Sequence, residues 1–174
     1  EKAGSLDNRM RRWFQNPQKL LSPFIRQGMR VLEIGCGPGF FTIDLAQMVG
    51  DSGKVFAADL QEGMLEKVRE KVKGTDLEER ITLHKCEVEK IGIEEPVDFV
   101  LLFYMVHEVP DKATFFSEIF SILKEDGRVL VVEPPFHVSK SAFEKTIGIA
   151  KNARLVDMRG PNVFFSKSAI LKKS

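Results

Sequence analysis

Short apolar runs alternate with helical stretches along most of the chain, and this alternation restricts the fold more than any other feature of the sequence. Each run is almost continuously apolar, which is typical of a strand that is buried on both faces. Strands that alternate with helices predict an α/β domain with a mostly parallel sheet and helices on both faces. The runs expected as strands are RVLEI (30–34), KVFAADL (54–60), RITLHKC (80–86), VDFVLLFY (97–104) and RVLVVE (128–133).

The helices are expected between these runs and after the last of them. The expected spans are 39–49, 62–73, a helix that follows Asp111 and carries apolar residues as far as Leu123, and roughly 139–152. Near the C-terminus, Gly160-Pro161 separates two extended segments. This pattern predicts an antiparallel hairpin at the sheet edge, which brings the sheet to seven strands.

The N-terminal residues 1–28 carry apolar side chains at helical spacing, and Asn16-Pro17 is typical of a helix start. We expect this segment to form a helical lid over an α/β core of residues 29–174. With 174 residues, the chain is expected to be a single domain.

Composition excludes several classes of function. A net charge of +1 and a pI of about 8.0 give no general attraction to nucleic acid or to anionic membranes. The basic-aromatic stretch RMRRWF (9–14) is too short to change this view, and we interpret it as part of the lid. No apolar run approaches the roughly 20 residues of a membrane span. With two cysteines and no leader-like start, we expect a cytoplasmic protein.

The stretch VLEIGCGPGFF (31–41) contains the end of the first predicted strand and the loop after it. Three glycines lie in this loop, Gly35, Gly37 and Gly39. In open α/β sheets, ligands bind at the carboxyl ends of the strands, where the strand order reverses. Glycines leave the backbone bare, so a ligand can approach it closely. The alternative is a tight turn that binds nothing.

Asp59 ends the second predicted strand, about 20 residues after the last glycine of the loop. A carboxylate at this place accepts hydrogen bonds from ribose hydroxyl groups. The alternative is that Asp59 caps the following helix.

Several details of the loop argue against phosphate groups. Phe40 stands where a dinucleotide fingerprint would have its third glycine, and the negative Glu33 would oppose a pyrophosphate. The later stretch GDSGK (50–54) resembles the end of a phosphate-binding P-loop. It is not one, because Met48 stands where the first glycine of that motif should be and neither Ser nor Thr follows Lys54. The expected ligand has a ribose, an adenine-like base and a cationic end but no phosphate, and S-adenosylmethionine meets these conditions.

On these residues, VLEIGCGPGFF resembles the first motif, acid-x-G-x-G-x-G, of the class I S-adenosylmethionine-dependent methyltransferases. VDFVLLFYMVHEVPD (97–111) and EDGRVLVVEP (125–134) are similar to the subgroup related to quinone-biosynthesis methyltransferases. The resemblance covers residues 30–133. It implies a Rossmann-like class I fold and methyl transfer to a small-molecule acceptor, with S-adenosylhomocysteine as product.

The resemblance also implies which residues bind the cofactor. Glu33 would lie near the methionine amino group and act through water or the loop amides, and the glycine loop would line the methionine. Asp59 would hold the ribose, and Leu60 would pack on the adenine. Glu87, where the family more often has Asp, would contact the adenine edge. The full set is Glu33, Gly35, Cys36, Gly37, Asp59, Leu60, Glu87, Val88 through its backbone N–H, and Phe103 through its carbonyl.

His107 and Tyr104 follow the fourth strand and are the candidate catalytic residues. His107 could act as a base or orient the acceptor, or it could brace the loop. Tyr104 could line the pocket or pack in the core. Glu133 and His137 are expected near the acceptor, or as caps of the next helix.

A metal site is not expected, because His84, His107 and His137 are scattered, and Cys36 and Cys86 are interpreted as small core residues. A small-molecule acceptor is the expected partner rather than nucleic acid, and a homo-oligomer is left open. Two alternatives to an enzyme of this class are kept. One is a methyltransferase-like subunit that binds the cofactor for a partner, and the other, less favoured, is an NAD-dependent oxidoreductase.

Overall fold

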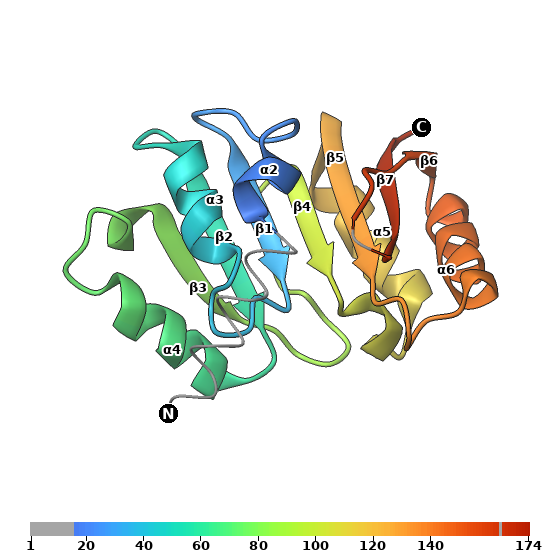
Figure 1. Ribbon diagram of the computed structural model, residues 1–174, viewed down its shortest axis with the longest axis horizontal. Helices are drawn as coiled ribbons and strands as arrows, with labels where there is room; N and C mark the ends of the chain where they lie inside the picture. Colours follow the sequence, from blue (N-terminus) through green and yellow to red (C-terminus); the bar gives the residue numbers. More distant parts are fainter. Residues whose placement is uncertain (1–15, 164) are drawn as a thin grey trace.

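A computed structural model describes residues 16–163 and 165–174, and it has a seven-stranded sheet in the order β3-β2-β1-β4-β5-β7-β6 (Figure 1). The strands are β1 (Arg30–Ile34), β2 (Lys54–Asp59), β3 (Ile81–Lys85), β4 (Val97–Phe103), β5 (Leu123–Glu133), β6 (Leu155–Arg159) and β7 (Lys167–Lys173). The helices are α2 (Pro17–Leu21), α3 (Thr42–Val49), α4 (Glu62–Val72), α5 (Lys112–Ile122) and α6 (Lys140–Asn152). Two single 3-10 turns are η1 (Glu78–Arg80) and η2 (Val106–Glu108).

The sheet topology confirms the predicted class. Strands β1 to β5 pair in parallel, whereas β7 pairs antiparallel with both β5 and β6. Strand β6 therefore runs in the same direction as the first five, and the predicted hairpin is the β6–β7 pair. The strand order reverses between β1 and β4, which places the expected ligand crevice at the carboxyl ends of these two strands.

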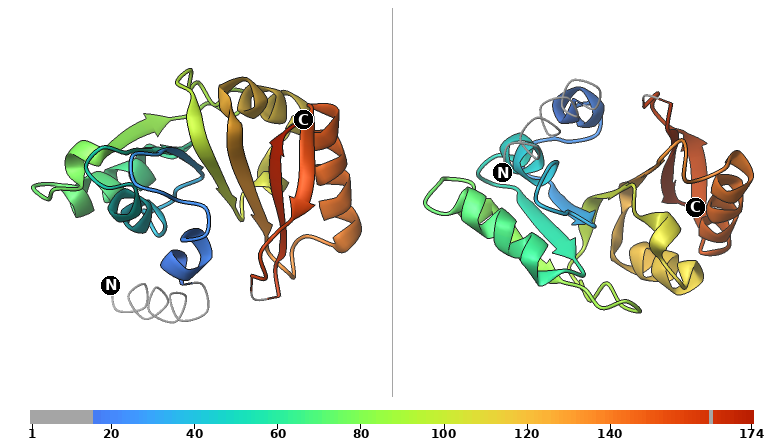
Figure 2. Two further views of the ribbon diagram at one scale, coloured as in Figure 1. Left: turned by 90° about the horizontal axis from the view of Figure 1, so that it is seen from above. Right: turned by 60° about the horizontal axis from the view of Figure 1, so that its bottom comes forward.

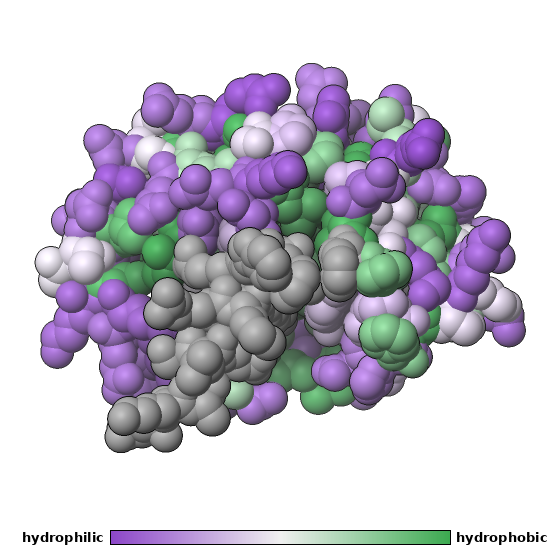
Figure 3. Space-filling view, viewed as in Figure 1, coloured by the Kyte–Doolittle hydropathy of each residue, from purple (hydrophilic) through white to green (hydrophobic). Residues whose placement is uncertain are grey.

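Helices cover both faces of the sheet, as predicted. Helices α2, α3 and α4 lie on one face, and α5 and α6 lie on the other (Figure 2). Val31 and Leu32 are adjacent in β1, point to opposite faces and are both fully buried. Burial on both sides explains why the strands are nearly continuous apolar runs. On the face seen in Figure 3, hydrophilic residues cover most of the outer rim and hydrophobic residues gather nearer the middle.

Two predicted boundaries were wrong. Helix α3 begins at Thr42 rather than at residue 39, because Gly39 has a φ of +84°, which no helical residue adopts. Strand β5 begins at Leu123, which was expected to end the preceding helix. Leu123 pairs with Val97 before a register shift in the β4–β5 ladder, so the strand starts well before the predicted Arg128.

The predicted start at Asn16-Pro17 is confirmed, because the Asn16 side chain accepts a hydrogen bond from the Lys19 amide at 3.1 Å. Leu21 anchors the short helix in the apolar core beside α3. Residues 1–15 of the predicted lid lie outside the described residues, so the lid stays a prediction. In the part of the chain that the structure describes, no helix is long and apolar enough to cross a membrane.

Candidate active site

The glycine loop folds back over the end of β2. The amides of Gly35 and Cys36 both donate to the carbonyl oxygen of Ala58, at 2.8 and 3.1 Å. Gly35 has a φ of +72°, and a Cβ atom there would lie 3.1 Å from the Cβ of Met105. The loop therefore needs glycine at this position both for its backbone conformation and for the close approach of Met105.

Asp59 ties the glycine loop to the start of α4. One carboxylate oxygen accepts the Gly37 amide at 2.8 Å, and the other accepts the Gln61 amide at 2.9 Å. The residue is only 8% exposed, yet it lines a cavity. Each carboxylate oxygen has a second lone pair, so Asp59 can accept two further hydrogen bonds from a ligand.

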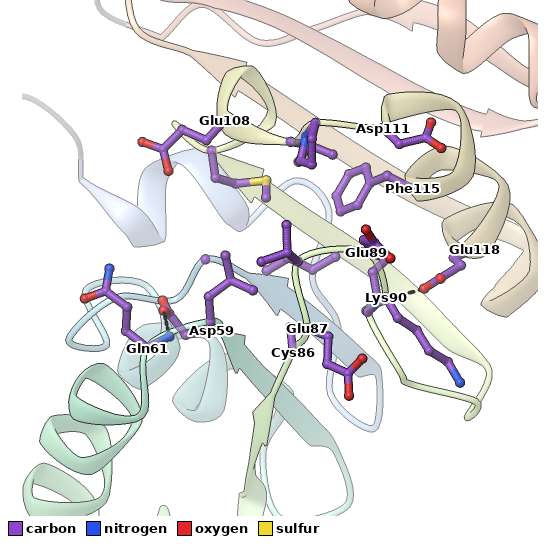
Figure 4. A pocket seen from close by; sticks show the side chains of 18 of the residues that line it. Asp59, Gln61, Cys86, Glu87, Glu89, Lys90, Glu108, Asp111, Phe115 and Glu118 are labelled. Atoms are coloured by element: carbon purple, nitrogen blue, oxygen red, sulfur yellow. Dashed lines mark hydrogen bonds between the residues drawn. The ribbon is translucent and has the colours of Figure 1, made fainter.

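The cavity lies between the glycine loop, the segment after β3, and the η2–α5 region. Figure 4 shows Asp59 and Gln61 on one side of it and Asp111, Phe115 and Glu118 on the other. The lining residues are Ile34, Gly35, Asp59, Leu60, Gln61, Cys86, Glu87, Val88, Glu89, Lys90, Ile91, Tyr104, Met105, Glu108, Val109, Pro110, Asp111, Phe115 and Glu118.

Carboxylates dominate the charge of this lining. Asp111 caps α5, and Glu118 accepts the Ile91 amide at 2.8 Å, so both have structural partners. Glu87, Glu89 and Glu108 lie at the mouth, with Lys90 as the single basic side chain of the lining. Such a site favours a ligand with a positive end and disfavours a phosphate.

Several predicted residues are brought together in this cavity. Gly35, Asp59, Leu60, Glu87 and Val88 all line it. Leu60 and Val88 are 51% and 63% exposed, so their apolar side chains form the rim. Leu60 directly follows β2, and Val88 lies in the segment after β3.

Glu33 is set apart from the residues that line the cavity. It lies beneath the loop, only 3% exposed, and does not line the cavity. Its carboxyl group accepts a hydrogen bond from the Thr42 hydroxyl at 2.5 Å. Burial raises the pKa of Glu33 to about 8, with a further contribution from the negative charge of Asp59. Glu33 therefore supports the first turn of α3 and reaches a ligand only indirectly.

Cys36 also points away from the cavity. It is 4% exposed and packs with Ala57, Leu65 and Val68 under α4. Burial raises the pKa of the Cys36 thiol, and it raises the pKa of the Cys86 thiol to about 11. Both thiols stay protonated at neutral pH, which agrees with the interpretation of small core residues.

Strand β4 ends at Phe103, and the next residue, Tyr104, lines the cavity. The Phe103 ring is 8% exposed and packs against the rings of Phe41 and Tyr104. Tyr104 both lines the cavity and packs in the core, so its two interpretations hold together. Its φ of +61° is unusual for a residue with a side chain, and its hydroxyl lies 2.6 Å from the Ser166 hydroxyl in the β6–β7 loop.

His107 lies outside the cavity lining, on the side of η2 that faces β5. Its backbone N–H donates to one oxygen of Glu133 at 3.1 Å, and its Nδ1 lies 2.6 Å from the other oxygen. Glu133 is 1% exposed, and the His137 ring lies 6.4 Å from the His107 ring. His107, Glu133 and His137 therefore lie close together, and Glu133 contacts His107, whereas the side chain that caps α6 is Ser139.

Sequence reasoning missed the contribution of the segment after β4. Met105, Val109 and Phe115 supply much of the apolar lining, and Gln61 lies beside Asp59. Phe115 precedes the residues of the predicted apolar face of α5, so a wider helical stripe could have included it. Nothing in the sequence marked Met105. Within residues 16–163 and 165–174, no three His, Cys, Asp or Glu side chains are grouped to hold a metal ion.

Comparison with known proteins decides the family. A sequence profile described as a methyltransferase domain matches residues 25–158. The chain belongs to the class I S-adenosylmethionine-dependent methyltransferases. A crystal structure of an S-adenosylmethionine-dependent methyltransferase from Aquifex aeolicus aligns with this methyltransferase at a TM-score of 0.81 and 27% identity, over 98% of this chain and 95% of the other. The fold and the cofactor expected from the glycine loop are thereby confirmed.

Two curated relatives have quinone-related names. The demethylmenaquinone methyltransferase of Lactococcus lactis is 36% identical over 121 residues, which are 67% of this methyltransferase and 48% of the relative. The ubiquinone/menaquinone biosynthesis C-methyltransferase of Cronobacter sakazakii is 31% identical over 69% of this chain and 47% of its own length. The chain thus spans about half the length of these relatives.

Proposed function

We propose that this methyltransferase transfers a methyl group from S-adenosylmethionine to a small-molecule acceptor and releases S-adenosylhomocysteine. The observation that carries the proposal is Asp59. Its two carboxylate oxygens are fixed by the Gly37 and Gln61 amides and keep their remaining lone pairs for a ribose diol. The bound cofactor supplies an electrophilic methyl group on a positively charged sulfur.

The chain's own residues suit the parts of that cofactor. Asp59 accepts from the ribose hydroxyls, and the bare backbone at Gly35 and Gly37 leaves room for the methionine. Leu60 and Val88 pack on the two faces of the adenine, and Glu87 accepts from its amino group. The Phe103 carbonyl, at the end of β4, accepts from the methionine ammonium group. Cys36 and Glu33 act from beneath, by packing the loop and by holding Thr42.

For the acceptor, we propose the reduced ring of a demethylmenaquinone-like quinone, methylated at a ring carbon. The names of the two relatives support this class. Apolar side chains also line the cavity, among them Leu60, Met105 and Phe115. A hydroxyl group on an aromatic ring makes the neighbouring carbon nucleophilic once its proton is removed, so such an acceptor needs little further activation.

The proposal is tested by calorimetry followed by an acceptor screen. We expect S-adenosylmethionine and S-adenosylhomocysteine to bind and NAD not to bind. Chemically reduced short-chain demethylmenaquinone, a catechol and a simple amine would then be compared by the yield of S-adenosylhomocysteine. Binding of NAD alone would support an oxidoreductase. Binding of S-adenosylmethionine without methyl transfer to any acceptor would favour a cofactor-binding subunit that serves a partner.

A further inference from the structure

The side chains of Glu133 and His107 form a pair that the cofactor cavity does not use. Glu133 ends β5 and His107 lies in η2, 26 residues apart in the sequence. The Glu133 carboxylate is almost completely buried and accepts from two atoms of the same residue, the backbone N–H and the Nδ1 of His107. Together the two contacts fix both the position and the orientation of the imidazole ring.

We propose that Glu133 positions His107 so that its Nε2 atom is the general base that deprotonates the acceptor. Glu133 is then a positioning residue and His107 a catalytic residue. This inference rests on the proposed function, because it assigns a step of that same methyl transfer.

The geometry fixes the role of each imidazole nitrogen. Because Glu133 is a carboxylate acceptor at 2.6 Å from Nδ1, the neutral ring carries its proton on Nδ1. The lone pair is then on Nε2, on the far side of the ring from Glu133. The His107 side chain is 27% exposed, whereas the Glu133 side chain is 2% exposed, so Nε2 is the part of the pair that a substrate can reach.

Three charged or titratable side chains face His107. Glu133 approaches from β5, and Glu108 of η2 has a carboxylate oxygen 3.8 Å from Nε2. His137, in the loop before α6, has its ring centre 6.4 Å away. The two carboxylates would stabilise the imidazolium that forms during the reaction. Glu108 also lines the cofactor cavity, so Nε2 lies beside a residue of that lining although His107 itself is not part of it.

In the step that we propose, the O–H bond of the acceptor hydroxyl breaks and its proton moves to Nε2. The electron pair stays on the acceptor and, through the ring, forms the new bond from a ring carbon to the methyl carbon. The sulfur keeps the pair of the S–C bond that breaks. The ring C–H proton then passes to water, and the imidazolium returns its proton to the acceptor oxygen, so atoms and charge balance.

The first test measures the tautomer without any activity. The nitrogen chemical shifts of ¹⁵N-labelled histidine report which ring nitrogen carries the proton. The sequence has three histidines, and the variants His84→Gln and His137→Gln identify the signals of the other two. We expect the Nδ1–H form for neutral His107, and a shift toward a mixture of tautomers in Glu133→Gln. An Nε2–H form in the unchanged protein, or identical shifts in Glu133→Gln, would overturn the proposal.

The second test uses methyl transfer to chemically reduced short-chain demethylmenaquinone. We expect His107→Gln to lower kcat by roughly 10²–10⁴-fold, with unchanged affinity for S-adenosylmethionine, and to remove the fall of kcat on the acid side of the pH profile. Glu133→Gln should lower kcat and alter the same acid limb. Glu125→Gln is the matched control, because Glu125 lies on the same strand, its side chain is 87% exposed, and it pairs with Lys173.

The outcomes separate this inference from the proposed function. If the unchanged protein transfers methyl groups and His107→Gln keeps its kcat and its acid limb, the base is wrong and the function stands. If the unchanged protein binds S-adenosylmethionine but methylates none of the acceptors, the proposed function fails and the assignment of the base fails with it.

Discussion

Replacing Asp59 by alanine should weaken S-adenosylmethionine binding more than any other single change in the site. The variant removes two acceptor oxygens that would each bind one ribose hydroxyl. A hydrogen bond to a charged group contributes about 1.5–3 kcal/mol, so two of them contribute at least about 3 kcal/mol, or roughly a hundredfold in Kd. The Gly37 and Gln61 amides also lose their partner, so the glycine loop loses order before any ligand arrives.

The assay is calorimetric titration with S-adenosylmethionine, combined with urea unfolding of the ligand-free protein. Glu89→Ala is the matched control, because it removes a carboxylate from the same cavity and Glu89 makes no hydrogen bond to the loop in the described structure. We expect Glu89→Ala to change Kd by less than about threefold, through charge alone. Asp59→Asn should resemble the alanine variant, because its NH₂ group would face an amide donor. An affinity within threefold of the unchanged protein for a folded Asp59→Ala variant would refute the reasoning.

Three further predictions follow from the loop and the buried groups. Gly35→Ala should lower the free energy of unfolding by about 1–2 kcal/mol and weaken cofactor binding. Gly63→Ala in α4, where an added Cβ meets nothing within 4 Å, should instead raise the free energy of unfolding by up to about 1 kcal/mol. Urea unfolding of both variants measures the difference. Between the ordinary pKa of 4.5 and the folded pKa of about 8, folded Glu33 holds a proton that the unfolded chain has released, so the stability that it contributes is lost as pH rises through this window. Glu33→Gln should remove that loss, and its advantage over the unchanged protein in urea unfolding should be larger at pH 8.5 than at pH 5. Cys36 and Cys86 should resist alkylation by iodoacetamide at pH 7.5 and react only after unfolding, as mass spectrometry would detect; rapid labelling of the folded protein would contradict their burial.

The strands were predictable because their burial is a property of the runs themselves. Val31 and Leu32 point to opposite faces and are both fully buried, so the apolar pattern is continuous and marks a central parallel strand. The first and last residues of helices and strands were harder to predict, because they depend on which residues pair across the sheet. Leu123 looks like the last apolar residue of a helix, and its pairing with Val97 draws it into β5 instead.

The gathering of Gly35, Asp59, Leu60, Glu87 and Val88 around one cavity was also predictable, because these residues follow the carboxyl ends of the parallel strands β1, β2 and β3. The position of Asp59 follows from the length of β2 and of the helix before it. The bonds that Asp59 makes to the Gly37 and Gln61 amides do not follow from spacing, since they depend on how the loop folds back. The hydrogen bond from Thr42 to Glu33 likewise does not follow from spacing, since it joins the end of β1 to the first residue of α3.

The surroundings of the two catalytic candidates, Tyr104 and His107, depend on contacts between distant parts of the chain. Tyr104 meets Ser166 across 62 residues, and His107 meets Glu133 across 26. The first contact joins the end of β4 to the β6–β7 loop, and the second joins the segment after β4 to β5. The residues predicted to bind the cofactor, apart from Phe103, belong instead to β1, to β2 and to the segments that follow β1, β2 and β3. The two sets of residues therefore meet at the end of β4, where Tyr104 takes its unusual φ of +61°. We therefore expect a change of Ser166 in the β6–β7 loop to alter the surroundings of Tyr104 while the Asp59 network stays in place, because the two networks share no hydrogen bond among the described residues.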